Sequence, residues 1–163
     1  MINIVRAGEE HLAGIIERWI ELMDYHAELD PLFTRSAEGH VGYREYTRKL
    51  MSEQKACVLV ALDGENVVGF SLSMVANYPP PLARRIYGYI SDVAVAQTYR
   101  GRGIGEKMVR KTLAWFAEQG ITRVELRVSS CNDVALSFWE RQGFREYVKV
   151  MQRDLDEKKW DGA

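Results

Sequence analysis

The sequence predicts a single α/β domain. A chain of 163 residues has the size of one domain. Segments with the apolar pattern of strands are interspersed with segments whose apolar residues recur at helical spacing. The predicted order is strand–helix–helix–strand–strand, followed by strand–helix–strand–helix–strand. This order combines an antiparallel front half with a back half whose strands are joined through helices.

The front half begins with residues that alternate between apolar and polar over Ile2–Arg6, which predicts a strand. Apolar residues from Leu12 to Met23 recur at helical spacing, and Pro31 breaks the helix that they predict. The turn at 64–66 favours a hairpin between its two flanking strands. The predicted elements are a strand over 2–6, helices over 8–29 and 36–51, and strands over 56–63 and 67–76.

The back half follows a stiff, proline-rich connection over 78–82. Gly120 and Gly143 stand where they can close two predicted helices. The predicted elements are a strand over 86–95, a helix over 106–119, a strand over 123–128, a helix over 133–142 and a last strand over 144–155. The domain is expected to span residues 1–155, with a frayed tail over 156–163.

Composition excludes several classes of function. The net charge of −1 gives no general attraction to nucleic acid or to acidic membranes. No apolar run approaches the ~20 residues that cross a membrane, and the first residues lack a signal-peptide layout. Cys57 and Cys131 form neither a disulfide framework nor a metal motif, and the histidines are scattered. We therefore expect a cytoplasmic protein without a metal site, a nucleic-acid partner or a membrane partner.

The run Tyr-Arg-Gly-Arg-Gly-Ile-Gly over 99–105 lies between the predicted strand 86–95 and the predicted helix 106–119. Glycines at such a turn allow the backbone to approach a ligand with its amides pointing outward. The helix adds roughly half a positive charge at its N-terminus, and Arg100 and Arg102 can add full charges. The segment therefore predicts a cradle for a pyrophosphate.

Other interpretations of this loop are a plain glycine-rich turn with solvated arginines or another nucleotide motif. A Walker loop requires Ser or Thr after its lysine, but Lys107 is followed by Met108. A dinucleotide fingerprint requires G-x-G-x-x-G, and here Glu106 occupies the place of the last glycine.

The spacing Arg100-x-x-Gly103-x-Gly105 resembles the signature of the GCN5-related N-acetyltransferases, the GNAT family. Residues 90–95 resemble the fourth strand of that family, and residues 124–128 resemble its fifth strand. The run from Asn132 to Phe144 resembles the family's N-x-x-A…G-F segment. The resemblance covers about 86–155, whereas the first half fits only in the order of its elements.

The resemblance implies a mixed central sheet whose fourth and fifth strands splay apart, flanked by helices, and it implies acetyl-CoA as cosubstrate. The pyrophosphate is then expected on the backbone of Arg100, Gly101, Arg102, Gly103, Ile104 and Gly105. The pantetheine arm is expected along Val93, Ala94 and Val95. Asn132 matches a position that contacts the cofactor, and it can equally cap the helix that follows.

Acyl transfer to an amine requires a neutral nitrogen, and deprotonating a lysine-like amine at pH 7 costs about 4–5 kcal/mol. Asp92 occupies the acidic position that many family members carry on this strand. Strand alternation places it on the opposite face from Val93 and Val95. An acid in an apolar strand suggests a catalytic base, although a structural acid paired with an arginine or a backbone amide is the other interpretation.

Trp139 stands where the family often carries a tyrosine that protonates the leaving thiolate. An indole donates a hydrogen bond but no proton at neutral pH. The general acid therefore stays open between Tyr99, Tyr147 and no acid at all, since a thiol pKa near 8.5 permits unassisted departure. Trp139 is then a core residue that faces the cofactor.

The resemblance places acceptor recognition in the first two helices and in the loop before the strand 86–95. Acids and an aromatic ring suit a cationic amine, and the first helix ends with Asp24, Tyr25, Glu28 and Asp30. Arg84 and Arg85 in the loop suit an anionic acceptor instead. The charge of the acceptor therefore stays open.

Together these features predict an N-acetyltransferase that acts on a primary amine of a small molecule or a protein. The alternative is an acyl-CoA-binding or sensing domain without catalysis, which Trp139 favours and Asp92 disfavours. A homodimer is compatible with both hypotheses.

Overall fold

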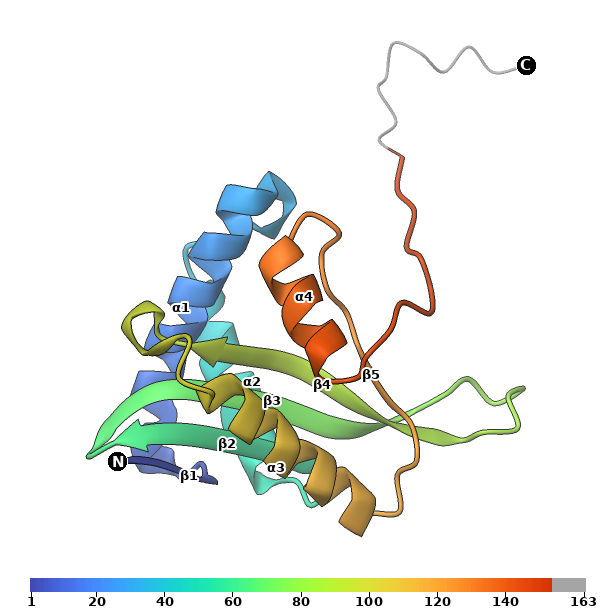
Figure 1. Cartoon of the computed structure of the whole chain (residues 1–163), viewed down its shortest axis with the longest axis horizontal. Coiled ribbons are helices and arrows are strands. Elements are labelled where there is room, and N and C mark those ends of the chain that lie inside the picture. Colours follow the sequence, from blue (N-terminus) through green and yellow to red (C-terminus); the bar gives the residue numbers. More distant parts are fainter. Residues whose placement is uncertain (154–163) are drawn as a thin grey trace.

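A five-stranded sheet forms the centre of the protein in a computed structural model that describes residues 1–153 (Figure 1). Short 3-10 turns precede or follow several elements: η1 (Glu9–His11), η2 (Pro31–Phe33) and η3 (Gln97–Tyr99). The helices and strands are β1 (Ile2–Arg6), α1 (Leu12–Leu29), α2 (Gly39–Ser52), β2 (Ala56–Asp63), β3 (Asn66–Asn77), β4 (Ile86–Val95), α3 (Ile104–Glu118), β5 (Val124–Leu126) and α4 (Asp133–Arg141).

The strands lie in the order β1-β2-β3-β4-β5. Neighbours from β1 to β4 are antiparallel, and β4 and β5 are parallel. The parallel pair follows from its connection, because α3 crosses the sheet between these two strands. The predicted mixed sheet within a single α/β domain is confirmed.

Helices cover both faces of the sheet (Figure 1). Under α1 and α2, Trp19 and Leu50 pack on Phe70 and Leu72 of β3. Under α3, Met108 packs on the opposite face, and Phe116 meets Ile90 of β4 in an adjoining cluster that also includes Trp139 of α4. The sheet thus separates an α1/α2 face from an α3/α4 face.

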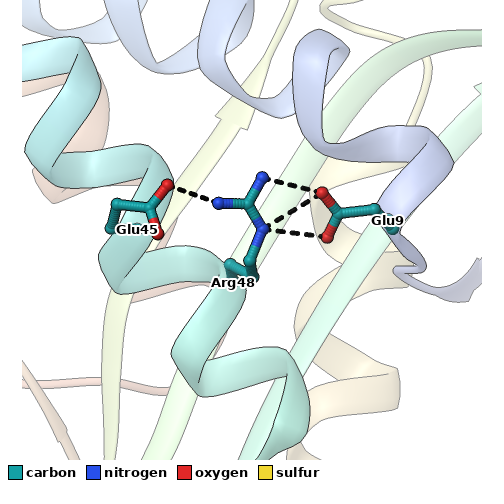
Figure 2. A network of polar contacts seen from close by, with 3 residues as sticks. All are labelled: Glu9, Glu45 and Arg48. Atoms are coloured by element: carbon teal, nitrogen blue, oxygen red, sulfur yellow. Dashed lines mark hydrogen bonds and ion pairs between the residues drawn. The ribbon is translucent and has the colours of Figure 1, made fainter.

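An ion-pair network joins α2 to the start of the first helical segment (Figure 2). The Arg48 guanidinium donates to Glu9 with N–O distances of 2.7 to 3.1 Å, and it also donates to Glu45 one turn earlier in α2. All three side chains are exposed, so the network contributes little to stability on its own. It links α2 to η1, the turn that precedes α1.

Strands β4 and β5 separate after a short contact. Pairing joins Gly88–Ile90 to Val124–Leu126, and β4 then continues over Ser91–Val95 without a partner on its β5 side among the described residues. The expected splaying of the fourth and fifth strands is therefore present, and it leaves part of the β4 edge open.

A β-bulge lies at the point where the strands separate. Opposite β3, Leu72 pairs with Asp92, whereas the next residue, Ser73, pairs with Ile90, so Ser91 is the extra residue of β4. A bulge re-aims the side chains that follow it. Ile90 consequently packs beneath α3, and Asp92 faces α1 and α2.

The predicted last strand over 144–155 is wrong for its described part. Residues 144–153 have no regular structure and lie outside the sheet, while 154–155 and the predicted tail over 156–163 lie outside the described residues. A strand forms only against a partner, and β5 offers three residues instead of the six expected over 123–128. The helix predicted over 36–51 begins later, at Gly39, and the one predicted over 106–119 begins earlier, at Ile104.

Candidate functional site

The glycine-rich loop adopts the backbone conformation that its composition predicts. Gly101 and Gly103 have φ angles of 74° and 73°, a region that costs an L-residue roughly 1–2 kcal/mol. A Cβ atom at either position would meet nothing within 4 Å, so the space above the loop is open. Gly103 is the N-cap of α3, and the amides of the first helical turn have no acceptor within the helix. The loop therefore offers outward-facing donors to an anion.

Two arginines hold this loop to its neighbours. Arg100 Nε donates to the Val95 carbonyl at 3.1 Å, and its guanidinium lies 5.7 Å from the centre of the Tyr25 ring on α1. Arg102 donates to the Thr98 carbonyl at 2.9 Å. Neither guanidinium forms an ion pair with a carboxylate in the part of the chain that the structure describes. Their positive charge stays available beside the amides of the loop.

The open edge of β4 carries the residues predicted to line the pantetheine arm. Val93 and Val95 point toward the α3 face, and Ala94 packs on the α1/α2 side. Backbone groups on this edge have no strand partner among residues 1–153. One of them, the Val95 carbonyl, accepts a hydrogen bond from the Arg100 side chain. An amide-containing chain fits such an edge as an added strand does. The loop and this edge together fit the phosphates and the arm of a CoA molecule.

Asn132 caps α4, as one of its two interpretations predicts. Its side chain is 5% exposed, and Oδ1 accepts from the Ala135 amide at 3.0 Å. This bond satisfies one of the free donors of the first turn. The contact between Asn132 and the cofactor stays a prediction.

Trp139 belongs to the core on the α3/α4 face. Its ring meets Phe138 and Phe144 edge-on, with centroids 5.0 and 5.2 Å away. Phe138 in turn lies 3.4 Å from the place where a Cβ of Gly105 would stand. Helix α4 therefore abuts the start of α3, and Trp139 packs behind the open edge of β4.

Asp92 lies just after the bulge and faces α1 and α2. Ser91 Oγ donates to Asp92 Oδ2 at 2.7 Å. Part of the residue reaches solvent, but protein atoms crowd the carboxyl, and this burial raises its pKa. Ser91, Tyr43 and His26 oppose the shift without cancelling it. A carboxylate with a raised pKa is a stronger base than a solvated one.

Two neighbours of Asp92 were missed at the sequence level. Tyr43 of α2 stacks on Trp19 with ring centroids 4.4 Å apart. Its buried hydroxyl lies near enough to Asp92 to lower the carboxyl pKa, although its geometry falls short of a formed hydrogen bond. The half-buried His26 of α1 has a pKa lowered by burial, which the charge of Asp92 partly offsets. No spacing in the sequence links three residues from α1, α2 and β4.

A groove of about 330 Å³ lies where β4 and β5 pair, and it is lined by Tyr87, Tyr89, Glu125, Leu126 and Arg127. Burial raises the pKa of Tyr89, with Arg127 opposing and Asp92 reinforcing the shift, so the groove lies within electrostatic range of Asp92. Arg123 donates to Glu125 at 2.7 Å, and Arg127 is exposed. The sequence gives no sign of this groove, because its residues come from two strands that pair only in the fold.

Some of the acceptor-binding residues predicted at the end of α1 already have polar partners in the structure, and others do not. Asp24 forms an ion pair with Arg35 at 2.9 Å, and Asp30 accepts from the Leu32 amide at 3.0 Å. Glu28 is exposed and has no polar partner among residues 1–153, and Tyr25 lies under Arg100. The structure thus brings this helix end beside the glycine-rich loop.

The arginines before β4 lie elsewhere. Arg84 donates to Thr122 at 3.2 Å, and Arg85 donates to the Pro80 carbonyl at 2.9 Å. Both precede Ile86 at the start of β4, about 30 Å along the strand from Val95. They are therefore separated from the glycine-rich loop by the length of that strand.

Metal-binding clusters and membrane-spanning helices were searched for in residues 1–153. No group of three or more histidine, cysteine, aspartate or glutamate side chains gathers there in a metal-binding arrangement. Within the same residues, every helix is too short or too polar to span a bilayer.

Comparison with known proteins decides between the families that the loop allows. Residues 19–144 match the model of the acetyltransferase (GNAT) family. The chain belongs to this family. Acetyl-CoA is the cosubstrate of GNAT enzymes, which transfer its acetyl group to amines, and the loop and open edge described above fit that cosubstrate.

Relatives of known sequence include an uncharacterised N-acetyltransferase of Archaeoglobus fulgidus, 30% identical over 145 residues, which cover 88% of this chain and 93% of the relative. N-alpha-acetyltransferase 30 of Schizosaccharomyces pombe is 30% identical over 97 residues. That match covers 60% of this chain and 63% of the yeast protein, so it spans less than two thirds of the latter's length.

Solved structures share the fold. A mutant of the BH1408 protein from Bacillus halodurans superposes with a TM-score of 0.85, at 24% identity, over 94% of this chain and 99% of that one. A Clostridium acetobutylicum protein described as a predicted acetyltransferase with acetyl-CoA has a TM-score of 0.77, at 16% identity, over 94% and 96% of the two chains. At these identities the similarity establishes the GNAT fold.

Proposed function

We propose that this chain transfers the acetyl group of acetyl-CoA to a primary amine that is deprotonated by Asp92. The observation that carries the proposal is the bulge at Ser91, which places the crowded Asp92 carboxyl two residues beyond the point where β4 parts from β5, next along the strand from a groove lined by Tyr87 and Tyr89. The open β4 edge and the groove are thus adjacent. A thioester held along the edge and an amine held in the groove meet beside Asp92.

The proposed roles follow from position. Amides of 100–105 and the start of α3 bind the pyrophosphate, with Arg100 and Arg102 as added positive charge. The edge of Val93–Val95 orients the pantetheine arm, and Asn132 and Trp139 flank it from α4. When bound, acetyl-CoA supplies an activated acyl carbon.

Asp92 takes the proton that the amine loses as the new C–N bond forms and the C–S bond breaks. Burial raises the carboxyl pKa toward that of the amine, which reduces the free-energy cost of this transfer. Trp139 cannot protonate the leaving thiolate, and a thiol pKa near 8.5 lets the thiolate depart unassisted. The proposed reaction therefore depends on a base that deprotonates the amine and does not depend on an acid that protonates the thiolate.

The acceptor is proposed to lie along the groove of Tyr87, Tyr89, Glu125 and Arg127, with its amine toward Asp92. Asp24, Tyr25, Glu28 and Asp30 at the end of α1 are the proposed contacts for a cationic amine. Of the three acids, Glu28 is the one whose carboxylate is free for that contact. The acceptor is a small molecule or a protein amine, and the site of action is the cytoplasm.

A thiol-release assay tests this function. Acetyl-CoA is incubated with the chain and a panel of amines that differ in charge and size, and free CoA is measured against a reaction without amine. Amine-dependent CoA release and a mass gain of one acetyl group on the amine are expected. Calorimetric binding of CoA without release for any amine in the panel would favour an acyl-CoA-binding domain instead.

A further inference from the structure

Two charged residues of opposite sign, Glu125 and Arg127, line the groove between β4 and β5. A few polar groups placed in a groove fix the orientation of its ligand. A charge that the protein has already paired contributes little to this, whereas an unpaired charge can bind a ligand group of opposite sign. The partners of these two residues therefore decide which kind of acceptor the groove fits.

The Glu125 carboxylate is paired within the protein. Arg123 Nε donates to Glu125 Oε1 at 2.7 Å, and the Tyr78 hydroxyl donates to the same oxygen. Burial by itself raises the pKa of Glu125, but Tyr78 and Arg123 together outweigh this effect and lower the pKa. Glu125 is therefore an ionised acid whose charge is balanced by Arg123.

The Tyr78 side chain is itself held in place by the wall of the groove. Its ring stacks on the ring of Tyr87 with centroids 4.3 Å apart, and its backbone amide donates to the Arg85 carbonyl at 3.0 Å. Tyr87 lines the groove and meets Tyr89 edge-on, with centroids 6.5 Å apart. The aromatic side of the groove thus fixes the donor that pairs with Glu125.

Arg127 has no comparable partner. Its side chain is exposed and lines the groove, and no carboxylate of residues 1–153 lies within ion-pair distance of its guanidinium. Burial raises the pKa of Tyr89, and the charge of Arg127 opposes this rise, so the guanidinium lies within electrostatic range of the Tyr89 hydroxyl. Among the described residues, Arg127 therefore contributes the unbalanced charge of the groove.

The strand register places Arg127 close to the proposed base. The paired segment ends with Ile90 beside Leu126, so Ser91 and Arg127 are the first residues beyond it. Asp92 is the next residue of β4, and it forms no ion pair with Arg127. Neighbouring strands lie ~4.8 Å apart, and these two are separating. One acceptor can therefore contact both residues, with its amine at Asp92 and a second group several ångströms away at Arg127.

The chemistry of Arg127 indicates what that second group is. A guanidinium presents planar, paired donors that match the two oxygens of a carboxylate. The one positive charge of Arg127 balances the one negative charge of a carboxylate, but it leaves part of the charge of a phosphate unpaired. Tyr87 and Tyr89 offer apolar ring surface to the carbon chain that joins the two groups.

We propose that the acceptor is a primary amine that also carries a carboxylate, which Arg127 binds while the amine lies at Asp92. This inference rests on the proposed function and narrows its acceptor to one class. It agrees with the acids at the end of α1, because a zwitterion carries a cationic amine and an anion together. A free amino acid and a peptide with an acidic side chain near its N-terminus both present this pair of groups.

Matched amines test the proposal in the thiol-release assay. Glycine, β-alanine, γ-aminobutyrate and ε-aminocaproate hold the carboxylate at increasing distances, and each is compared with the same amine without the carboxylate. The amides of glycyl-aspartate and glycyl-asparagine make the same comparison for a peptide. In at least one pair, the carboxylate should lower KM about tenfold, as expected for hydrogen bonds between charged groups. Equal KM values in every pair would overturn the proposal.

Arg127→Gln tests the residue that is proposed to bind the carboxylate. KM for the preferred carboxylated amine should rise about tenfold, while kcat, KM for acetyl-CoA and KM for the amine without a carboxylate stay unchanged. Arg127→Lys should retain part of the preference, because it keeps the charge. Arg110→Gln is the matched control, since Arg110 is exposed on α3, across the sheet from α1 and α2. An equal loss in this control would mean that the general charge of the protein, and not Arg127, sets the preference.

Glu125→Gln tests the opposite charge of the groove. Glutamine keeps an oxygen that can accept from Tyr78 and Arg123, but it removes the negative charge near Arg127. KM for the carboxylated amine should therefore fall, by about twofold. A rise in KM would show that Glu125 binds the amine, and the proposal would be wrong.

Calorimetry separates this inference from the proposed function. The preferred carboxylated amine is titrated into the chain in the presence of CoA, which has no acetyl group to transfer. Binding to the wild type and weaker binding to Arg127→Gln are expected, and no binding to the wild type would overturn the carboxylate site. If this difference is found but no amine releases CoA from acetyl-CoA, the proposed function fails and the carboxylate site stands. If amines are acetylated equally well with and without a carboxylate, the carboxylate site fails and the function stands.

Discussion

The cofactor loop and the surroundings of Asp92 are built in opposite ways. The loop is one continuous stretch over 99–105, and its glycine angles and helix start follow from its own residues. Burial raises the pKa of Asp92, Tyr43 and His26 from two helices limit that rise, and a bulge in the strand sets the direction of the carboxyl. A site made of consecutive residues should lose function through backbone changes. A site assembled from distant elements should respond to changes in its neighbours.

The largest effect is expected for Asp92→Asn. Removing a general base typically lowers turnover by 10²–10⁴-fold, and the loss should shrink at high pH, where the free amine is abundant. The wild-type profile should have one rising limb, displaced above the ordinary carboxyl range because burial raises the pKa of Asp92. Turnover against pH for both proteins with the same amine checks this. Parallel profiles with full activity would remove Asp92 from the mechanism.

Thermal stability gives an independent check on Asp92. Because its folded pKa is raised, its stability contribution is complete below the unfolded value near 3.9 and is lost as pH rises through the folded pKa. Asp92→Asn should therefore gain melting temperature relative to wild type between pH 4 and pH 7. A constant difference across that range would mean that the carboxyl is not destabilised by burial.

Gly103→Val tests the loop through its backbone. A residue other than glycine at φ 73° is strained by roughly 1–2 kcal/mol, so the loop should shift and CoA affinity should fall about tenfold. Gly120→Val is the matched control, because Gly120 has φ 71°, equally open space, and a place at the far end of α3. Calorimetry with CoA should separate the two variants. Equal affinities would show that the loop does not form the cradle.

Tyr43→Phe tests whether the acid site depends on its neighbours. The Tyr43 hydroxyl lowers the pKa of Asp92, so its removal should move the rising limb of the pH profile to higher pH. The Phe ring can retain the stack on Trp19, and the lost hydroxyl has no formed hydrogen bond, so stability should change little. A lower plateau at all pH values without a shift of the limb would argue against coupling to Asp92.

The smallest effect is expected for Trp139→Tyr. Tyrosine keeps an aromatic ring between Phe138 and Phe144 and adds a group that can donate a proton. Turnover should stay within a few-fold of wild type, and a falling limb should appear toward the tyrosine pKa near 10. Initial rates from pH 6 to 10.5 measure both. Complete loss of activity in a folded variant would mean that the indole itself is required.

The sequence by itself determined the order of helices and strands as far as α4, the left-handed glycines of the loop, the N-cap at Asn132 and the acid on β4. Each of these depends on residues close together in the chain, whose backbone preferences and periodicity act locally. The family resemblance supplied acetyl-CoA and the splayed strands. The predicted last strand over 144–155 failed in its described part because pairing is not a local property, and β5, at three residues, offers only a short edge.

Only the tertiary structure decided which groups surround Asp92 and where the groove between β4 and β5 lies. Helices α1 and α2 pack on the same face of the sheet, where burial raises the pKa of the Asp92 carboxyl and Tyr43 and His26 partly oppose that rise. The groove exists because β4 and β5 pair over three residues and then part. Electrostatic and steric effects of this kind depend on distance in space, and spacing along the chain does not encode that distance when the partners are tens of residues apart.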